Sequence, residues 1–396
     1  MSLILTQMVA WGSVFHAPAV LYAHMASGTG IAPEFVFGGL TVMLLIGGLL
    51  SPAAGRVLER DGARRWMVIG SGLVALGLCV LAMARGPVAF LLAWAIFGAA
   101  MPIALNQGAS TALVQIAPAR ARNAIAILLL VTGVSSFVAW PTLIWLADGL
   151  GWRGALVVFA ALNVFVCMPL HAWSLPGPAQ ALRERDDPEP LPESLAPPPV
   201  PVRGAYALAA ISFALGGMLT WGLPLHMVGI LTGFGHAEKT AVAVGSLFGL
   251  GQMLARGFEM VGGRRFDILT IGVLAALLMP AALAALLVWG ASPAGAVAFA
   301  IVYGLSTGFM SIVRAVAPLR LFGVAAYARV LGRLNVPQNI AFGVTPFGFA
   351  LVRESWGAQA LVEIALGLAW LCLVATVLLQ LRVRAVERRA GRGASR

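Results

Sequence analysis

Residues 55–65 read GRVLERDGARR and lie between two apolar runs. The runs near 35–55 and 67–84 are each long enough to cross, as an α-helix, a hydrocarbon core of about 30 Å. Glycines in the turn permit close backbone approach, and its charged side chains offer ion pairs at a helix end. These residues are Gly55, Glu59, Arg60, Gly62, Arg64 and Arg65. The stretch therefore predicts two membrane-spanning helices joined by a short charged turn.

The same alternation of apolar runs and polar breaks continues along all 396 residues. Hydrophobic residues make up 60% of the chain and charged residues 10%, against about 25% charged in ordinary globular proteins. This composition excludes a soluble protein. Apolar windows predict twelve spans, near 2–24, 35–55, 67–84, 87–117, 123–147, 153–175, 204–231, 239–258, 268–290, 294–318, 328–352 and 357–381.

The basic residues indicate the orientation of these spans. If both termini are cytoplasmic, 21 of the 26 Lys and Arg residues fall on the inner side, four fall on the outer side, and Arg314 lies within a span. This asymmetry is typical of multi-pass membrane proteins. A net charge of +11 spread over short loops, with no continuous basic stripe, argues against nucleic-acid binding. Arg- and Ala-rich composition suggests a bacterial inner membrane.

One connection differs from the others. Residues 176–203 are rich in proline, mix acidic with basic residues and have few aromatic or β-branched side chains, so they predict a mobile cytoplasmic linker. The predicted domains are a six-helix bundle at 1–175, this linker, a second six-helix bundle at 204–382 and a basic cytoplasmic tail at 383–396. The fold class is all-α integral membrane, with two pseudo-symmetric bundles.

Two matches suggest that the bundles are repeats. Trp11-Gly12 followed by His16 corresponds to Trp221-Gly222 followed by His226. The charged turn after the second span recurs after the eighth, and two ordered matches in equivalent places indicate duplication. The residues of the second turn are Glu259, Gly262, Arg264 and Arg265.

The turn at 55–65 resembles the loop signature between the second and third helices of the major facilitator superfamily, with Glu59 where that family usually has Asp. Gly151-Trp152-Arg153 at the sixth span is also similar to a feature of these transporters. The resemblance covers essentially the whole chain. It implies a secondary transporter whose halves rock about a central site by alternating access. Trp11-Gly12 and Gln252-x-x-x-Arg256 look most like bacterial relatives of the monocarboxylate and oxalate/formate transporters.

Polar residues that share one arc of a helix are candidates to line a substrate cavity, because an α-helix turns about 100° per residue. In the tenth span, such an arc of about 140° contains Tyr303, Ser306, Thr307, Ser311 and Arg314. Further candidates from other spans are Asn335, Gln338, Asn339, Gln7, Trp11, Tyr22, Asn106, Gln107 and Trp221. The same rotation places Trp11 and His16 about 140° apart, so at least one of them should pack against a neighbouring helix.

Two arginines have alternative interpretations. Arg314 either binds an anionic substrate through its guanidinium or lies near the inner surface and snorkels to lipid headgroups. Arg256, one turn after Gln252, has the spacing with which monocarboxylate transporters engage substrate, although Gln252 replaces the acidic partner of that family. The internal repeat aligns Arg256 with Arg56, which favours an interfacial arginine instead.

His16 and His226 are candidates for proton coupling or for hydrogen bonds between helices. Interfacial roles are expected for His24, His171 and His236. No Asp or Glu lies in the middle of a span, so an anion or neutral solute is favoured as substrate over a lipophilic cation. The charged turns either gate the transport cycle or only retain the loop on the inner side.

The function expected from these residues is transport of a small organic anion such as a monocarboxylate, with drug or toxic-metabolite efflux as the alternative. A channel or membrane enzyme is less favoured, since the spans contain no GxSxG, HExxH or paired carboxylates. The three cysteines lie in separate spans without metal-binding spacing. We expect no cofactor, no metal and no nucleic-acid partner. The expected partners are a small-molecule substrate, a possible coupling proton and the bilayer, with the protein acting as a monomer.

Overall fold

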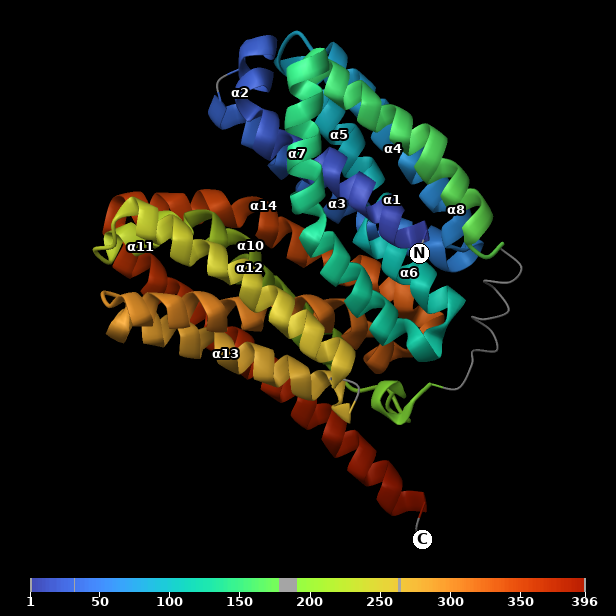
Figure 1. Ribbon diagram of the computed structural model, residues 1–396. Coiled ribbons are helices and arrows are strands. Elements are labelled where there is room, and N and C mark those ends of the chain that lie inside the picture. The colour runs from blue at the N-terminus through green and yellow to red at the C-terminus, as the bar shows by residue number, and fades with distance from the viewer. Residues whose placement is uncertain (1, 32, 178–190, 263–264, 395–396) are drawn as a thin grey trace. The chain divides into compact units, whose positions relative to one another are not determined.

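The computed structural model describes residues 2–31, 33–177, 191–262 and 265–394, and most of these residues are helical (Figure 1). Eight helices are long and apolar enough to cross a membrane, and the bent pair Ser2–His16 and Val20–Thr29 can form a ninth span. Glycines with positive φ divide two of these long helices, at Gly151 and at Gly323 and Gly357. The two divided helices give five segments, which with the other six helices and the bent pair make twelve in the described part of the chain. The predicted all-α membrane fold is confirmed.

The chain divides into two compact units, and each is described by itself. Unit 1 comprises residues Met1–Pro190 and Val324–Asn339. Its helices are α1 (Ser2–Trp11), the π-helix η1 (Gly12–His16), α2 (Ala17–Thr29), α3 (Pro33–Asp61), α4 (Ala63–Met83), α5 (Pro87–Ala104), α6 (Asn106–Ile116), the short η2 (Pro118–Arg120), α7 (Ala121–Leu162), the π-helix η3 (Asn163–Cys167) and α8 (Met168–Ser174).

The core of unit 1 forms where α3, α4 and α5 pack together. Trp94 is fully buried between Phe90 and Phe97, with its ring edge-on to Phe97 at 5.5 Å between centroids. A Cβ atom at Gly39 would lie 2.3 Å from the Trp94 ring nitrogen, so only glycine leaves room for this indole. Small residues that admit a large neighbour are a common solution for helix packing in membranes, where the hydrophobic effect does not drive association.

Unit 2 comprises Leu191–Gly323 and Ile340–Arg396. Its helices are the short η4 (Glu193–Leu195), α10 (Ala205–Gly222), η5 (Leu223–His226), α11 (Met227–Gly233), α12 (Glu238–Val261), α13 (Ile268–Trp289) and most of α14 (Pro293–Ala394). The glycine breaks divide α14 into segments 293–322, 324–356 and 358–394. The core includes buried Phe299 and Tyr303, whose ring centroids lie 5.4 Å apart.

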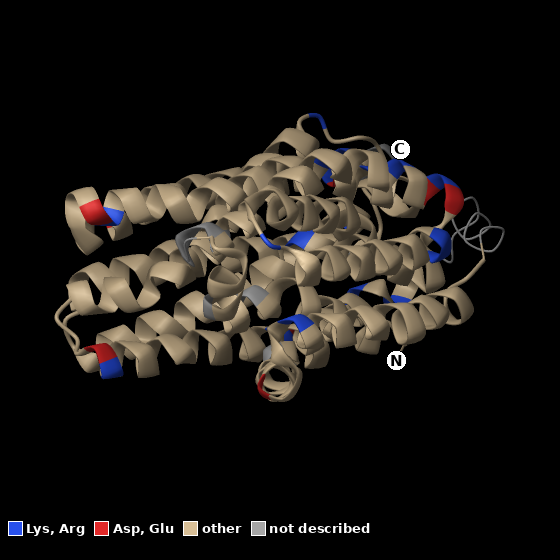
Figure 2. Cartoon of the chain, turned by 90° about the horizontal axis from the view of Figure 1, so that it is seen from above, with Lys and Arg blue, Asp and Glu red and all other residues tan. Residues whose placement is uncertain are grey.

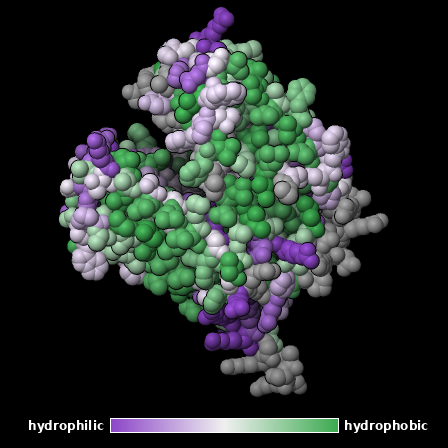
Figure 3. Space-filling view, viewed as in Figure 1, coloured by the Kyte–Doolittle hydropathy of each residue, from purple (hydrophilic) through white to green (hydrophobic). Residues whose placement is uncertain are grey.

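Charge and hydropathy fit a membrane environment. Charged residues gather mainly towards helix ends, and long stretches without charge lie between them (Figure 2). The helix bodies present extensive apolar surface (Figure 3). Exposed Leu, Val, Phe and Trp side chains would be costly in water but are the favoured lipid-facing residues of a spanning helix. The chain is therefore a multi-pass integral membrane protein.

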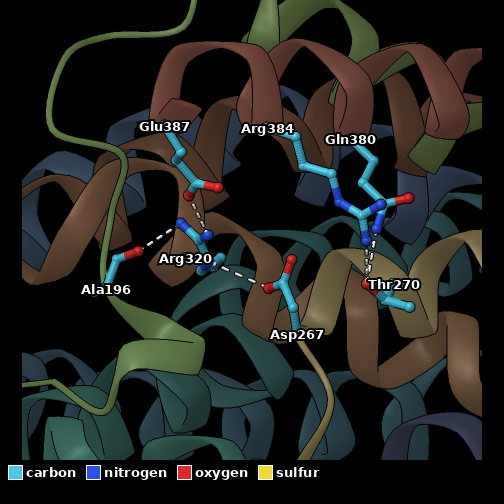
Figure 4. A network of polar contacts seen from close by, with 7 residues as sticks. All are labelled: Ala196, Asp267, Thr270, Arg320, Gln380, Arg384 and Glu387. Atoms are coloured by element: carbon cyan, nitrogen blue, oxygen red, sulfur yellow. Dashed lines mark hydrogen bonds and ion pairs between the residues drawn. The ribbon is translucent and has the colours of Figure 1, made fainter. Parts of the chain in front are cut away.

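The described part of the expected linker is held against unit 2, which differs from the predicted mobility. Leu195 is buried, and the carbonyl of Ala196 accepts a hydrogen bond from Nη1 of Arg320. Arg320 also pairs with Asp267 and with Glu387 of the C-terminal helix (Figure 4). Composition did not reveal these contacts, because a buried arginine from elsewhere in the chain supplies them. Residues 178–190 of the linker lie outside the described residues.

The described part of the C-terminal tail is helical, since α14 continues to Ala394. Gln380 and Arg384 both donate hydrogen bonds to Oγ1 of Thr270 at the start of α13, at 2.7 and 3.2 Å (Figure 4). These bonds and the Arg320–Glu387 pair fix the first turns of the tail to unit 2.

Candidate functional site

The turn between α3 and α4 is built around Gly62. This residue has φ 78° and ψ 161°, a conformation that favours glycine, and it directly precedes the first residue of α4. Gln115 of α6 stabilises the turn from the side, since its Oε1 accepts from the Ala63 amide at 2.9 Å and its Nε2 donates to the Leu58 carbonyl at 2.9 Å. The predicted tight turn is present, and Gln115 is a contributor that the local sequence pattern did not indicate.

The arginines of this turn do not pair with Glu59. Arg60 instead forms a two-pronged ion pair with Asp61, at 2.6 and 3.0 Å, and Asp61 also accepts from the Trp66 indole at 3.1 Å. Arg64 is half-buried and Arg65 is exposed, and neither has an ion pair among the described residues. Asp61 therefore takes the role in the turn that the sequence analysis gave to Glu59.

Glu59 pairs with Arg329, which lies in the segment 324–339 that belongs to unit 1. Both guanidinium nitrogens Nε and Nη2 of Arg329 donate to the carboxylate, with Nε 2.9 Å from Oε2. A two-pronged pair of this kind fixes both position and orientation. A separation of 270 residues in sequence explains why local spacing did not predict the partner.

Glycines bring α3 and segment 324–339 into close contact. A Cβ atom at Gly55 would lie 2.5 Å from the carbonyl oxygen of Ala328, and one at Gly332 would lie 2.3 Å from that of Ser51. Larger residues at either glycine would push against backbone, which cannot rotate away. Gly55 was predicted from the turn pattern to allow close backbone approach, whereas Gly332 was not singled out.

The second charged turn, after α12, differs in detail from the first. Glu259 is fully buried and Arg265 is exposed. Gly262 has φ −129°, in contrast to the positive φ of Gly62, so the two glycines are not equivalent in conformation. Arg264 lies outside the described residues. The sequence repeat is therefore not reproduced as an exact backbone repeat.

Unit 1 contains a buried group of amide side chains. Nε2 of Gln107 donates to the Ser51 carbonyl at 3.0 Å, and its Oε1 accepts from Asn335 at 2.8 Å. Gln107 thus connects α6 to α3 and to segment 324–339. Two residues predicted to line a cavity, Gln107 and Asn335, are brought together here from positions 228 residues apart.

Gln7 stabilises a break in the fourth span. The backbone of Leu105, at φ −97° and ψ −149°, separates α5 from α6, and Nε2 of Gln7 donates to the Ala104 carbonyl at 2.7 Å beside this break. Among the amide side chains of unit 1 that were predicted to line a cavity, three have an atom without a hydrogen-bond partner in the described residues: Oε1 of Gln7, Oδ1 of Asn106 and Nδ2 of Asn339. Unpartnered buried amide atoms retain the capacity to bind a polar ligand or water.

The first span contains a π turn at η1, which alters the relation between Trp11 and His16. A π turn closes i to i+5 hydrogen bonds, so the α-helical estimate of 140° between these residues does not hold. Trp11 stacks on Phe15 at 4.4 Å between ring centroids. Nε2 of His16 lies 3.0 Å from Oγ of Ser135. Tyr22, also predicted to line a cavity, is exposed.

The polar arc of the tenth span divides between two surroundings. Tyr303 is buried and donates to the Leu219 carbonyl at 2.8 Å, and Ser306 donates to the Ala275 carbonyl of α13 at 2.7 Å. Both hydroxyl hydrogens are therefore used in helix packing. Thr307 and Ser311 donate to carbonyls one turn earlier in their own helix, at 3.0 and 2.6 Å. Thr307 also accepts from Nε2 of Gln252 at 3.2 Å.

Arg314 and Arg256 are both buried within unit 2, each 8% exposed. Nη1 of Arg314 donates to Oγ1 of Thr220 at 3.3 Å, and its guanidinium lies 5.7 Å from the ring centroid of Phe342. Arg256 lies one turn after Gln252 in α12, and its Nε has no hydrogen-bond partner among the described residues. Neither arginine forms an ion pair with a carboxylate in the described part of the chain.

The contacts given for the remaining predicted residues are mainly those of helix packing. Trp221 is partly exposed and lies 5.4 Å from the Phe342 ring. Nε2 of His226 donates to the Pro346 carbonyl at 3.0 Å, a hydrogen bond between helices. Gln338 is half-buried. His171 was expected at the interface but is buried, with its ring nitrogens 3.1 Å from Oγ of Ser71 and 2.9 Å from Oγ1 of Thr6.

Comparison with known proteins identifies the family. The sequence profile of the Major Facilitator Superfamily matches residues 3–346. The chain belongs to the major facilitator superfamily. No curated protein sequence matches this major facilitator significantly, so the nearer assignment to monocarboxylate or oxalate/formate relatives has no support from sequence comparison.

Solved structures resemble this major facilitator over nearly its whole length. The human organic anion transporter TETRAN aligns with a TM-score of 0.66 at 18% identity, covering 94% of this chain and 97% of that one. The transporter FucP, in its outward conformation, gives 0.67 at 12%, covering 96% and 97%. The proton:xylose symporter XylE gives 0.69 at 13%, covering 96% and 94%. At these identities the likeness establishes the fold alone.

The family and the fold together indicate a transporter and not an enzyme. Within the described residues, no group of three or more His, Cys, Asp or Glu side chains is arranged to hold a metal ion.

Proposed function

We propose that the chain is a secondary transporter for a small organic anion such as a monocarboxylate, with Arg314 as the principal substrate-binding residue and Arg256 as its helper. The observation that carries this proposal is the burial of two arginines without a carboxylate partner. A guanidinium matches the planar, two-oxygen geometry of a carboxylate.

The energetic cost of the two arginines supports a ligand. Moving a charged side chain from water into the protein interior costs about 2 kcal/mol or more, unless an opposite charge or strong hydrogen bonds offset this cost. Arg314 has one hydroxyl contact at 3.3 Å and the face of Phe342. The arginines also repel one another electrostatically. An anion bound beside them would reverse this unfavourable balance, whereas a cationic drug would be repelled.

The burial of Arg314 also favours binding over snorkelling. A snorkelling arginine extends its charged end to the headgroup region. Arg314 instead directs its guanidinium to Thr220 and Phe342 inside unit 2. Arg256 is likewise buried, so an interfacial role suggested by the sequence repeat is less favoured.

We also propose that the contact between α3 and segment 324–339 takes part in alternating access. The chain leaves unit 1 at Asn339 and enters unit 2 at Ile340 within one continuous helix. A rocking motion of the units would exert a force on this helix. That force would disturb the Glu59–Arg329 ion pair and the close contacts at Gly55 and Gly332. The charged turn would then bias the conformational equilibrium as well as retain the loop on the inner side.

Uptake into proteoliposomes tests the anion proposal. Purified protein is assayed with a panel of labelled monocarboxylates, neutral sugars and lipophilic cations, and the best substrate is then tested with Arg314→Lys and Arg314→Gln. We expect a carboxylate to be the best substrate and the glutamine variant to lose transport. The lysine variant should keep part of the activity, because it retains the charge without the two-pronged geometry.

The matched control is Arg85→Gln, which removes an exposed arginine without described contacts. Transport by the control should equal that of the wild type. Preferred uptake of a cation, or carboxylate uptake unaffected by Arg314→Gln, would contradict the proposal, while the membership in the superfamily would stand.

A further inference from the structure

A second cationic feature of unit 2 lies where the C-terminal helix meets the beginning of α10, well separated in sequence from Arg314. A cavity of about 450 Å³ is lined there by Val202, Arg203, Arg382, Ala385, Val386 and Arg389. Three of its six lining residues are arginines, and no acidic residue lines it. Hydrophilic residues gather around this end of the molecule, near the C-terminal part of α14 (Figure 3).

The arginines of the cavity are not neutralised by nearby carboxylates. Glu387, which lies between Arg382 and Arg389 on α14, is paired with Arg320, as is Asp267 (Figure 4). Arg203, Arg382 and Arg389 have no ion pair within the described ranges of the chain. Asp267 and Glu387 are thus engaged by Arg320, and the six residues that line the cavity carry only positive charge.

The backbone adds to this positive character. Nη1 of Arg382 donates to the Arg203 carbonyl at 3.1 Å, which holds the guanidinium beside the N-terminus of α10. The 18-residue α10 begins at Ala205, directly after Gly204 in a left-handed conformation. The N-terminus of a helix carries a partial positive charge and exposes amide hydrogens that bind anions, phosphate in particular.

The surface beside the cavity is apolar. Val374, Leu378 and Leu381 precede Arg382 on α14, and all three are exposed. Leu378 and Arg382 are one turn apart, and Arg389 lies two turns beyond Arg382, so the helix changes from a lipid-facing apolar surface to a cationic one along its length. A ligand that fits both parts has an anionic head and apolar chains.

We propose that this cavity binds the phosphate group of an anionic phospholipid. The headgroup phosphate would sit among Arg203, Arg382 and Arg389, and the acyl chains would lie along Leu378 and Leu381. The excess of Lys and Arg at this end places the site in the cytoplasmic leaflet. This binding is independent of the transported substrate, because none of its residues contributes to the Arg314 region.

The proposal is tested with the full-length protein in detergent, titrated with short-chain phosphatidylglycerol, with phosphatidylcholine of the same chain length and with inorganic phosphate. Binding is followed by native mass spectrometry and by the shift in thermal unfolding temperature. We expect phosphatidylglycerol to bind at least about tenfold more tightly than either other probe. Replacing one cavity arginine should weaken binding about fivefold. This factor corresponds to the roughly 1 kcal/mol that a basic residue contributes near a membrane surface.

The chain offers a matched pair of variants. Arg389→Gln removes a cavity arginine, whereas Arg388→Gln removes its neighbour, which is exposed but does not line the cavity. Both change the net charge equally, so only a defined site distinguishes them. Arg203→Gln provides a third variant, from the turn that precedes α10, and an unchanged elution profile in size-exclusion chromatography shows that each variant is folded.

Three outcomes would overturn the proposal. Equal weakening by Arg388→Gln and Arg389→Gln would mean diffuse attraction to the basic tail. Equal affinity for phosphatidylcholine would remove the requirement for a net negative lipid. Inorganic phosphate binding as tightly as phosphatidylglycerol would assign the cavity to a soluble ion instead of a lipid.

Discussion

The polar interiors of the two units differ in how fully their buried side chains are compensated. In unit 1, neutral amides form hydrogen bonds with backbone and with one another, as Gln107 does with Ser51 and Asn335. In unit 2, Arg256 and Arg314 are buried without a carboxylate partner among the residues that the structure describes. Bonded amides stabilise the structure that contains them, whereas uncompensated charges destabilise it. If the anion proposal is correct, the buried arginines of unit 2 should matter more for binding than for stability, and the bonded amides Gln107 and Asn335 of unit 1 more for stability.

Replacing Arg314 with methionine would test this comparison most strongly. Arg314→Met removes the buried charge and keeps a flexible, unbranched side chain. The free energy of unfolding without substrate should therefore rise by about 1–3 kcal/mol, and the melting temperature should rise with it. Carboxylate uptake should fall about 30-fold or more, as for loss of a hydrogen bond to a charged group. A fall in both melting temperature and uptake would instead identify Arg314 as a structural residue.

Gly332→Leu would test the close contact in unit 1. The new side chain would meet the Ser51 carbonyl, so we expect a loss of about 2 kcal/mol in stability and a marked drop in turnover. Gly367→Leu, in the same helix α14, is the control, because a Cβ atom there meets nothing within 4 Å. Wild-type melting temperature and transport in Gly332→Leu would show that segment 324–339 does not pack tightly on α3.

Substitutions in the amide pair of unit 1, Gln107 and Asn335, should lower the stability of the protein, whereas Arg314→Met should raise it. Asn335→Leu leaves Oε1 of Gln107 without its described partner, so the free energy of unfolding should fall by about 1–2 kcal/mol. Gln107→Leu should cost a similar amount, and the double variant less than the sum, in a double-mutant cycle measured by thermal unfolding. Additive losses would mean that the two side chains do not interact.

The smallest effect is expected at the Glu59–Arg329 pair. Arg329 is 48% exposed, so Glu59→Gln should change stability by about 1 kcal/mol or less, and by less still in high salt. If the pair gates the cycle, its loss should alter the rate of uptake more than the melting temperature. Arg329→Gln should reproduce the phenotype, and the double variant should add nothing. An unchanged rate in both variants would confine the pair to packing.

Hydrophobic runs were sufficient to predict the fold class and the twelve spans, because bilayer thickness constrains helix length directly. The turn at Gly62 was also predictable, since a glycine between charged residues and two apolar runs is a local signal. The partners of its charges were not. Glu59 meets Arg329 and Gln107 meets Asn335 through contacts more than 200 residues apart. A single sequence does not show which residues that are distant along the chain come into contact in the fold.

The interior residues show the same limit. Helical periodicity placed Tyr303, Ser306 and Arg314 on one arc, but it could not show that Ser306 bonds to α13 while Arg314 turns to Thr220. The π turn at Gly12–His16 also altered the rotation on which the Trp11 and His16 estimate depended. Neighbouring helices, and not the period of one helix, decide which polar groups remain available to a ligand.

The contacts of Arg320 have a consequence for the order in which the protein folds during synthesis. Its buried guanidinium is satisfied by the Ala196 carbonyl, Asp267 and Glu387, and Glu387 follows all other members of this network in the chain. A nascent chain still short of this glutamate holds an incompletely neutralised cation in its interior. The final packing of unit 2 around Arg320 is therefore expected only after Glu387 has been synthesised.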